Sequence, residues 1–455
     1  MSESISPLNE LAEALSAQGV RWVLGAYSDI AGRARGKVVP VRLLADAAAG
    51  SEHYTPRGLD GLGEMTSDEE CYTLPDPATL RILETDKRLA VMAADLMYQG
   101  RPYVLCPRRV LKEQLALASG MGYRCLAGVE TEFYVFQSDS CSTGKELKPL
   151  ISTSKLWPTP AYDAAATIDA MDFLTAMADG LDAAGFGVYS FDQEGGDGQY
   201  EFDFAHDDAL SMADKVVFFR ILAKATARQF GGVASFMPKP ASDLWGSGAH
   251  LNMSLVGEDG SNAFVGDGTA GFSERVAEQG NGWSDDCYHF IAGILEHAAA
   301  LSAITCPSVN SYKRIVPELD DGGTSWAPTH ACFGINEREA LIRLPANRPA
   351  IENRLVDSAA NPYLAIAAVL GCGIRGIKEK ADPSPYRIGA EGRAAKSALP
   401  RNLSEALDAL EADTVVRDIL SEELWSEYLR MKRHEWSEYH STVTEWERSR
   451  FLTAF

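Results

Sequence analysis

The stretch Gly128-Val-Glu-Thr-Glu-Phe-Tyr-Val-Phe136 is the segment from which the predicted fold is built. Its aromatic and β-branched residues alternate with acidic ones, and this period of two predicts a β-strand with Glu130 and Glu132 on the same face. Two like charges on one face repel each other. We therefore expect a cation above them, and a divalent ion bound by oxygen ligands is the usual solution. The alternative is an acidic strand face that is simply solvated.

The chain as a whole is acidic. Of its 455 residues, 64 are Asp or Glu and 42 are Lys or Arg, which gives a formal net charge of -22. This balance argues against nucleic acid as a partner. A small anionic substrate is compatible with it if metal ions and clustered arginines reverse the field in one pocket. The length allows two or three domains, and the 46% hydrophobic content supports a large core.

The N-terminus and the cysteines both favour a cytoplasmic protein. Residues 1–7 lack a basic region followed by an apolar run, and no later segment offers about 20 uncharged apolar residues, so we expect no membrane contact. The eight cysteines include no Cys-x-x-Cys pair. Reduced, mostly buried thiols are the expected state.

The first hundred residues predict a small α+β unit. Apolar spacing predicts a helix at 8–15, followed by a strand at 20–26 and a hairpin turn within 29–40. Residues 51–77 show no periodicity and are expected to form a long functional loop. Two further apolar runs complete the unit, which ends near Pro107, where a new helix begins. We therefore expect domains at 1–106 and 107–455.

The second domain is predicted to be a catalytic α+β domain. Strands are expected at 128–136, 186–192, 199–204 and 248–255, and helices at 163–184, 208–230, 285–302, 362–378, 403–412 and 422–448. Short strands and long helices alternate irregularly. This order favours helices packed outside an antiparallel or mixed sheet.

Six residues in predicted strands or at strand ends carry side chains that bind divalent ions: Glu130, Glu132, Glu194, Glu201, His250 and Glu352. Five carboxylates and one imidazole could hold two ions, and this oxygen-rich set favours Mg²⁺ or Mn²⁺ over zinc. The alternative is a buried structural histidine together with ordinary surface glutamates.

Five arginines follow within one short part of this acidic chain: Arg314, Arg338, Arg343, Arg348 and Arg354. Guanidinium groups bind carboxylates and phosphates through paired hydrogen bonds. Acidic residues that hold metals, next to arginines that hold oxyanions, are what phosphoryl transfer to a carboxylate requires. The chain has no Gly-x-x-x-x-Gly-Lys-Ser/Thr motif, which excludes a P-loop enzyme.

Taken in order, these motifs resemble the glutamine synthetase family over nearly the whole chain. The similar segments are Gly128-Val-Glu-Thr-Glu132-Phe, Glu194 with Gly198-Gln-Tyr-Glu201, Phe236-Met-Pro-Lys-Pro240, Gly246-Ser-Gly-Ala-His250, Asn310-Ser-Tyr-Lys-Arg314, Glu352-Asn-Arg354 and Asn361-Pro-Tyr363. The run Thr324-Ser-Trp-Ala-Pro328 is similar to the branch that includes γ-glutamylmethylamide synthetases and the glutamine synthetase type III-like enzymes.

The resemblance implies a fold and an activity. The expected fold is an N-terminal β-grasp-like domain and a C-terminal catalytic domain, assembled as a dodecamer of two hexameric rings with active sites between subunits. The expected reaction is ATP-dependent: the γ-carboxylate of glutamate is phosphorylated, and an amine then displaces phosphate. One metal ion would be held by Glu132, Glu194 and Glu201, and the other by Glu130, His250 and Glu352.

The resemblance also implies roles for other residues. Gly246, Arg314 and Arg354 would bind glutamate, and Arg338 and Arg343 would contact the phosphates. The amine pocket would comprise Asp60, Gly63 and Tyr162, with Asp60 supplied by a neighbouring subunit. The residues expected to take part in catalysis are Asp60, Arg338 and Glu352.

Departures from the family pattern bear on the amine. Asp60-Gly-Leu-Gly63 replaces Asp-Gly-Ser-Ser, which removes a hydroxyl group near the nitrogen site. Trp245 stands where Asn is usual, and Asn252 replaces the second His of His-x-His. The flap carboxylate is left open between Glu318, Asp320 and neither. These changes favour a small alkylamine such as methylamine. Two alternatives are a glutamine synthetase that uses ammonia and a non-catalytic ring-forming scaffold, which the intact ligand set disfavours.

Overall fold

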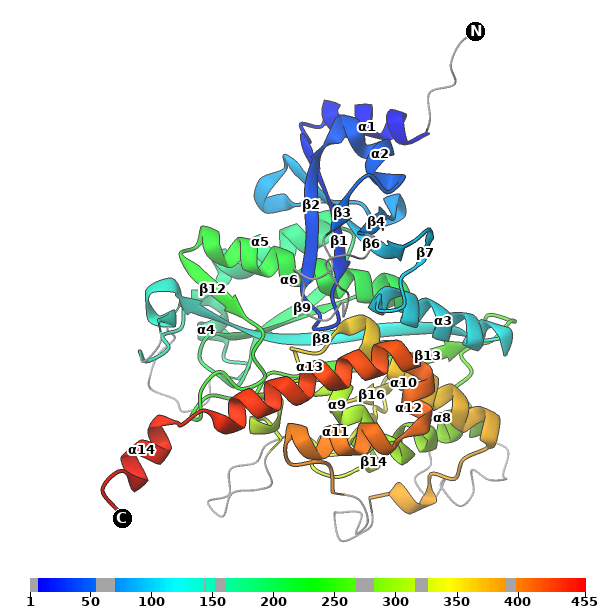
Figure 1. The fold of residues 1–455 in the computed structure, drawn as a ribbon, viewed down its shortest axis with the longest axis vertical. Coiled ribbons are helices and arrows are strands. Elements are labelled where there is room, and N and C mark those ends of the chain that lie inside the picture. Colours follow the sequence, from blue (N-terminus) through cyan, green and yellow to red (C-terminus); the bar gives the residue numbers. More distant parts are fainter. Residues whose placement is uncertain are drawn as a thin grey trace.

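The computed structural model describes residues 7–54, 70–142, 145–151, 161–266, 282–315, 326–388 and 398–455. A small N-terminal unit sits on a larger C-terminal unit, and each contains its own β-sheet (Figure 1). The N-terminal sheet ends with β7 (Arg101–Pro102), and α3 (Pro107–Gly120) then leads into the second sheet. The fold is α+β, as predicted.

The N-terminal unit is a mixed sheet covered by two helices. The strand order is β2-β1-β6-β4-β3, with β5 and β7 also paired to β6. The bounds are α1 (Pro7–Ala17), β1 (Trp22–Ser28), β2 (Ala34–Pro40), α2 (Leu44–Ala48), β3 (His53–Tyr54), β4 (Cys71–Pro75), β5 (Arg81–Ile82) and β6 (Leu89–Tyr98). β1 and β6 run parallel, whereas β1 and β2 form the predicted antiparallel hairpin.

The prediction of one long loop at 51–77 is wrong at both ends. β3 and β4 pair with each other there, and β4 also pairs with β6. Burial alternates along β4, as a half-buried strand requires. The five residues of this strand are too few for that period to stand out against the polar residues before it.

The C-terminal sheet has the strand order β14-β15-β16-β13-β8-β10-β9, with β11 and β12 also paired to β8. The bounds are β8 (Arg124–Gln137), β9 (Val188–Gln193), β10 (Gln199–Phe204), β11 (Asp207–Asp208), β12 (Gly232–Ser235), β13 (Ala249–Val256), β14 (Phe333–Ile335), β15 (Ile342–Leu344) and β16 (Ile351–Asn353). All these pairs are antiparallel except β14 with β15. The sheet is therefore mixed, with β8 at its centre.

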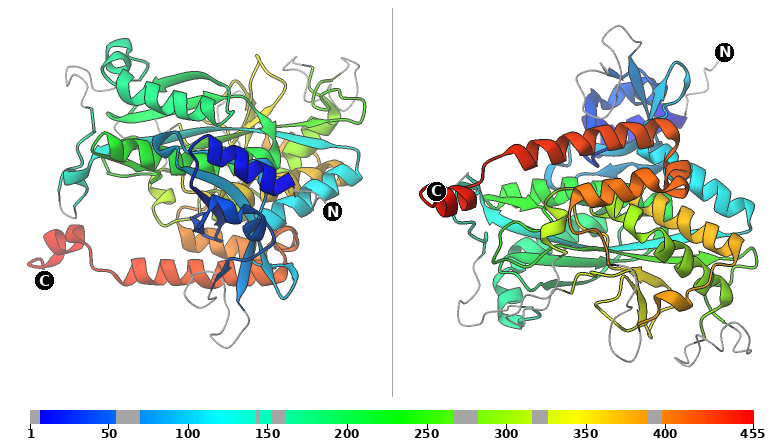
Figure 2. Two further views of the ribbon diagram at one scale, coloured as in Figure 1. Left: turned by 90° about the horizontal axis from the view of Figure 1, so that it is seen from above. Right: turned by 60° about the horizontal axis from the view of Figure 1, so that its bottom comes forward.

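Helices surround this sheet and supply most of the core. They are α4 (Ala164–Asp169), α5 (Met171–Ala183), α6 (Ala209–Gln229), α8 (Asp285–Glu296), α9 (Ala298–Thr305), α10 (Pro362–Glu379), α11 (Leu403–Ala412), α12 (Thr414–Leu420), α13 (Glu422–Ser441) and α14 (Glu445–Phe451). α10 is buried along almost its whole length. α13 runs along one side of the molecule, and α14 projects beyond the body (Figure 2).

Helix boundaries differ from the predictions where local caps intervene. The helix predicted at 285–302 is two helices that meet at 77° beside His297. The one predicted at 422–448 stops at Ser441, and α14 restarts with a capping box between Thr444 and Glu447. α12 was not predicted. Asp413 caps it by accepting hydrogen bonds from Val415 and Val416.

The two faces of β8 have opposite character. Phe133 is fully buried, and its ring packs on Phe219 of α6 and on Phe236, with centroid distances of 5.6 and 5.4 Å. Its neighbour Glu132 points the other way because successive side chains alternate along a strand. The aromatic core therefore fixes the strand whose opposite face carries the acidic residues.

All eight cysteines are free thiols, and seven are buried, as predicted. No single helix in the described ranges has the length and apolar composition to cross a membrane, and the bent pair α8 and α9 passes that test only when its two helices are combined.

Candidate active site

Strand register brings the predicted metal ligands to one face of the C-terminal sheet. Glu132 of β8 lies opposite Glu201 of β10, and Glu130 lies opposite His250 of β13. Residues paired directly across strands point to the same face. Glu194 follows β9 and is held by a hydrogen bond from its N–H to the carbonyl oxygen of Gln199 at 2.9 Å.

These side chains line a cavity of about 500 Å³. Its walls include all six predicted metal ligands and the predicted substrate-binding residues Tyr162, Gly246, Arg314, Arg338, Arg343 and Arg354. The structure thus brings together every predicted site residue that it describes. Asp60 and Gly63, and the candidate flap residues Glu318 and Asp320, lie outside the described residues.

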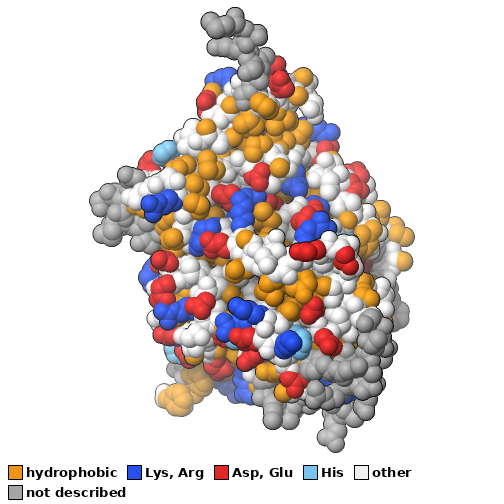
Figure 3. Space-filling model, turned by 90° about the vertical axis from the view of Figure 1, so that its right-hand side faces the viewer, with side chains coloured by type: hydrophobic (Ala, Val, Ile, Leu, Met, Phe, Trp, Pro, Cys, Tyr) orange, Lys and Arg blue, Asp and Glu red, His pale blue; other side chains and the backbone are white. Residues whose placement is uncertain are grey.

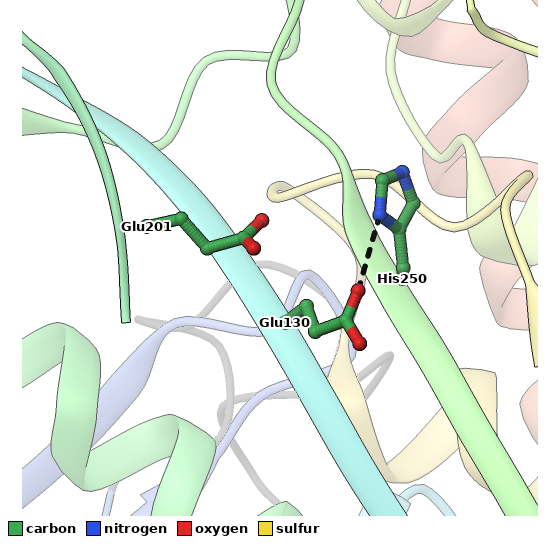
Figure 4. A group of neighbouring side chains, drawn as sticks. All are labelled: Glu130, Glu201 and His250. Atoms are coloured by element: carbon green, nitrogen blue, oxygen red, sulfur yellow. Dashed lines mark ion pairs between the residues drawn. The ribbon is translucent and has the colours of Figure 1, made fainter. Parts of the chain in front are cut away.

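Two groups of side chains are close enough to share a metal ion. In each group, one ligand atom per residue lies within 4.8 Å of the others. The first group is Glu132, Glu194 and Glu201, as expected. The second is Glu130, Glu201 and His250 (Figure 4). Glu201 therefore belongs to both groups, and carboxylate oxygens dominate each, which fits Mg²⁺ or Mn²⁺.

Glu352 belongs to neither three-residue group but lies beside them. Its Oε1 is 3.9 Å from Nδ1 of His250. Its carboxylate is fully buried and pairs with Arg343 at 2.7 Å, with Arg348 at 3.2 Å, and with Arg354. The family resemblance placed Glu352 in the second metal set. In the structure its nearest charged partners are arginines.

Glu130, Glu132, Glu194 and Glu201 form an acidic cluster in this cavity. Burial and mutual repulsion of these carboxylates favour a bound cation there. Burial, together with the charge of Glu194, raises the pKa of Glu132 to about 7. Burial and neighbouring carboxylates raise the pKa of Glu201 well above its ordinary value. Burial and the nearby Arg354 hold the pKa of His250 well below its ordinary value, so its imidazole is neutral and can bind a metal.

Two aspartates that were not predicted from the sequence also belong to this acidic cluster. Asp192 lies opposite Glu201 in the β9–β10 pair, and Asp203 is two residues beyond Glu201 on β10. Burial and acidic neighbours raise the pKa of Asp192 to about 7 and that of Asp203 to about 6. Each forms an i, i+2 acidic pair with a predicted ligand. That spacing, which revealed Glu130 and Glu132, could have revealed both.

Glycines let charged groups approach closely here. A Cβ atom on Gly246 would lie 2.7 Å from Cγ of Arg314, so a larger residue would displace this arginine. The guanidinium of Arg314 donates to the carbonyl oxygens of Arg354 and Leu355, both at 3.0 Å. The N–H of Gly248 donates to Glu132 Oε2 at 2.9 Å. The Gly-Ser-Gly segment therefore lets the arginine approach on one side and holds a carboxylate on the other.

A second cavity of about 280 Å³ adjoins the first. Glu130, Asp203 and Arg348 line both cavities. Its other walls are less charged and include Tyr189, His206, Ser254 and Pro349. Arg348 lies at the junction, where its Nη2 donates to Glu130 Oε1 at 3.1 Å and to Asn252 Oδ1 at 2.8 Å. The sequence showed this arginine without giving it a role.

Residues 104–451 match the family model for the glutamine synthetase catalytic domain. The chain belongs to the glutamine synthetase family. It is 34% identical to the glutamate–methylamine ligase of Methyloversatilis universalis, over 98% of this chain and 99% of that one. It is 35% identical to the glutamine synthetase of Rhizobium meliloti, over 94% and 96%. The resemblance inferred from the motifs is confirmed.

Solved structures give the same result for the fold. The structure described as a GmaS/ADP complex, conformation 1, superposes with a TM-score of 0.87 at 33% identity and covers 98% of this chain and 99% of its own. Apo GmaS gives a TM-score of 0.86 at 34% identity, with coverage of 97% and 99%. A glutamate–methylamine ligase and a glutamine synthetase are about equally similar to this chain in sequence, so the amine must be argued from the site.

Proposed function

We propose that this protein is an ATP-dependent glutamate–amine ligase that forms a γ-glutamyl amide. The observation that carries the proposal is the cavity in which two oxygen-rich ligand groups face five arginines. A divalent ion held by Glu132, Glu194 and Glu201, and another held by Glu130, Glu201 and His250, would neutralise and bridge phosphate oxygens. Glu352 supports this region by orienting Arg343 and Arg354.

The remaining residues would bind and orient the substrates. Arg314 and Arg354 would pair with the glutamate carboxylates, and Arg338 and Arg343 with the phosphates. The γ-carboxylate oxygen would attack the terminal phosphorus of ATP and release ADP. The amine nitrogen would then attack the acyl carbon, lose a proton and release phosphate. The second cavity supports a place for the nucleoside, because it opens on the acidic cluster and offers the rings of Tyr189 and His206.

For the amine we propose methylamine or another small alkylamine, with ammonia as the alternative. The support is the similarity to a glutamate–methylamine ligase and the Asp60-Gly-Leu-Gly63 sequence. Ammonium needs a hydrogen-bond acceptor on every side, and a missing acceptor costs about 1 to 3 kcal/mol. Methylammonium needs one acceptor fewer and some apolar room, which Gly63 would leave.

With ATP, Mg²⁺ and glutamate present, we expect kcat/KM for methylamine to exceed that for ammonia by roughly fivefold at equal total amine, since one methyl group contributes about 1 kcal/mol. Phosphate release across a panel of amines measures this. Gly63→Ser should move the ratio towards ammonia. A wild-type ratio at or below one would contradict the alkylamine assignment. Phosphate release without glutamate would contradict the ligase function itself. No phosphate release with any amine would favour the non-catalytic scaffold.

We also propose that the chain works as a cytoplasmic homo-oligomer, namely the dodecamer of two hexameric rings. Burial of seven free thiols supports a reducing compartment. The projecting C-terminal segment supports association, because Trp446, Leu452 and Phe455 are 60%, 74% and 103% exposed at its end. Further hydrophobic patches lie among mixed charges on the side of the molecule (Figure 3).

A mass measurement in solution tests the assembly. The intact protein is expected at twelve times the 49.3 kDa of one chain. A variant that ends at Ser441 should dissociate into smaller species, while far-ultraviolet circular dichroism shows retained helices. A monomeric full-length protein, or an unchanged mass after truncation, would contradict the role given to α14.

A further inference from the structure

Three aromatic side chains line the same cavity as the carboxylates: Tyr162, Trp245 and Trp326. The two tryptophan rings meet edge to face, with centroids 5.8 Å apart at 88°. The guanidinium carbon of Arg338 lies 5.6 Å from the centroid of the Trp326 ring. Trp326 is 40% exposed and Tyr162 is 59% exposed, so both rings offer apolar surface inside a strongly polar cavity.

The chain fixes two of these rings beside Glu194. The indole of Trp245 packs on Gly195, where an added Cβ would lie 2.4 Å from a ring carbon. The backbone carbonyl oxygen of Trp245 accepts a hydrogen bond from the hydroxyl of Tyr134 at 2.9 Å. The contact with Gly195 places the indole against the residue that follows Glu194. Trp245 also immediately precedes Gly246, the glycine that admits Arg314.

Tyr162 is held in an unfavourable backbone conformation. Its φ is +59°, a left-handed value that is strained for a bulky residue. Its N–H donates to the carbonyl oxygen of Gln193 at 2.9 Å, which keeps it at the turn that carries Glu194. Strain of this kind persists where the surrounding structure enforces it, and it is common at ligand sites.

We propose that Trp245 and Trp326, together with Tyr162, form an aromatic wall that binds the alkyl group of the amine. This inference rests on the proposed ligase function and adds residues on this chain that select the substrate class. Ring faces attract an alkylammonium ion and tolerate its C–H groups. Ammonium gains less from the same wall, because the rings leave one of its N–H groups without a strong acceptor.

The perpendicular arrangement of the two indoles also limits the size of the amine. Trp326 and Trp245 form a corner, and removing one ring would open it. Trp326→Ala should therefore reduce use of methylamine most, reduce use of ammonia least, and raise use of ethylamine relative to methylamine. Trp245→Asn, which restores the residue usual in the family at this position, should shift preference towards ammonia.

The experiment measures kcat/KM for ammonia, methylamine and ethylamine at saturating ATP and glutamate. We expect the ratio of methylamine to ammonia to fall roughly tenfold in Trp326→Ala and in Trp245→Asn, the scale of one cation–π contact. Trp326→Phe keeps a ring and should retain most of the ratio. Trp22→Ala is the matched control, because Trp22 is 42% exposed but lies in the N-terminal sheet and lines neither cavity.

The outcomes separate the two proposals. A wild-type protein that releases no phosphate with any amine overturns the ligase function. An active ligase whose ratio is unchanged in both tryptophan variants overturns the aromatic wall and leaves the ligase standing. The aromatic wall is also overturned if the variants only raise the KM for glutamate, since the rings would then contact the amino acid. Glutamate binding measured by calorimetry shows whether each variant keeps its site.

Discussion

Replacing Glu201 by Gln is expected to lower kcat of the proposed ligase by roughly 1000-fold, the largest effect on activity that the described residues indicate. Glu201 is the single residue shared by the two groups of ligand atoms that the described residues provide. Its loss weakens both candidate metal positions, and metal stabilisation of transferring phosphate is worth several kcal/mol. The amide is nearly the same size, so the strand pair β8–β10 should remain intact.

Phosphate release measures the loss of activity, and melting with and without Mn²⁺ measures the loss of metal. The wild-type protein should gain several degrees in Tm with Mn²⁺, and Glu201→Gln should gain much less. Glu13→Gln, an exposed change on α1, is the control and should behave as wild type. A Glu201→Gln protein with normal activity and a normal response to Mn²⁺ would contradict the assignment of this cluster as the metal site.

The stabilising effect of Mn²⁺ should also depend on pH. In the metal-free folded protein the pKa of Glu132 is about 7, whereas its ordinary value is 4.5, so the carboxyl keeps its proton through this range. Between about pH 4.5 and pH 7 the unfolded chain therefore binds fewer protons than the folded protein, and the free energy of unfolding falls as pH rises through this window. A cation that binds the ionised carboxylates offsets this loss. The gain in Tm with Mn²⁺ should be larger at about pH 8 than at about pH 6.

The sequence predicted the ligands of this site more completely than their arrangement. Glu130 and Glu132 could be placed on one face because a strand has a period of two, which is a local property. The pairing of Glu132 with Glu201, or the position of Glu352 among three arginines, depends on which strands are neighbours. β16 lies more than 200 residues from β8 in the chain, and no local pattern gives that register.

The errors in the secondary structure predicted from the sequence have a similar cause. α8 and α9 form a continuous apolar pattern in sequence, but the chain bends beside His297, whose Nδ1 lies 2.7 Å from Asp413 Oδ2. That partner is more than 100 residues away. α12 is only seven residues long and gains its stability from the buried Val416, Ile419 and Leu420. Tertiary packing decides such short elements, and propensity alone does not predict them.

Asp214→Ala is expected to cause the largest loss of stability that the described residues indicate. Arg108 of α3 donates to both oxygens of Asp214 of α6 at 3.0 Å, and each side chain is 2% exposed. Tyr363 donates to the same carboxylate at 2.6 Å. Burial alone lowers the pKa of Arg108, but the hydrogen bonds and charge of Asp214 raise it above its ordinary value.

Removing the carboxylate leaves a buried guanidinium with too few partners, which costs about 3 to 5 kcal/mol. Thermal unfolding measures the change, with Asp408→Ala as the matched control. Asp408 also pairs with an arginine, Arg433, but its side chain is 67% exposed, so its loss should cost less than about 1 kcal/mol. Equal shifts in Tm for the two variants would contradict the importance given to the buried pair.

The same variant tests how the two units of the chain are joined. Arg108 also pairs with Asp76 and Asp95 of the N-terminal unit at 3.0 and 3.1 Å, so one guanidinium connects that unit to α6. With Asp214 present, the two units should unfold together. Without it, Arg108 keeps only its N-terminal partners, and unfolding is expected to separate into two transitions, the earlier one from the N-terminal unit. A single cooperative transition in Asp214→Ala would show that other contacts between the units suffice.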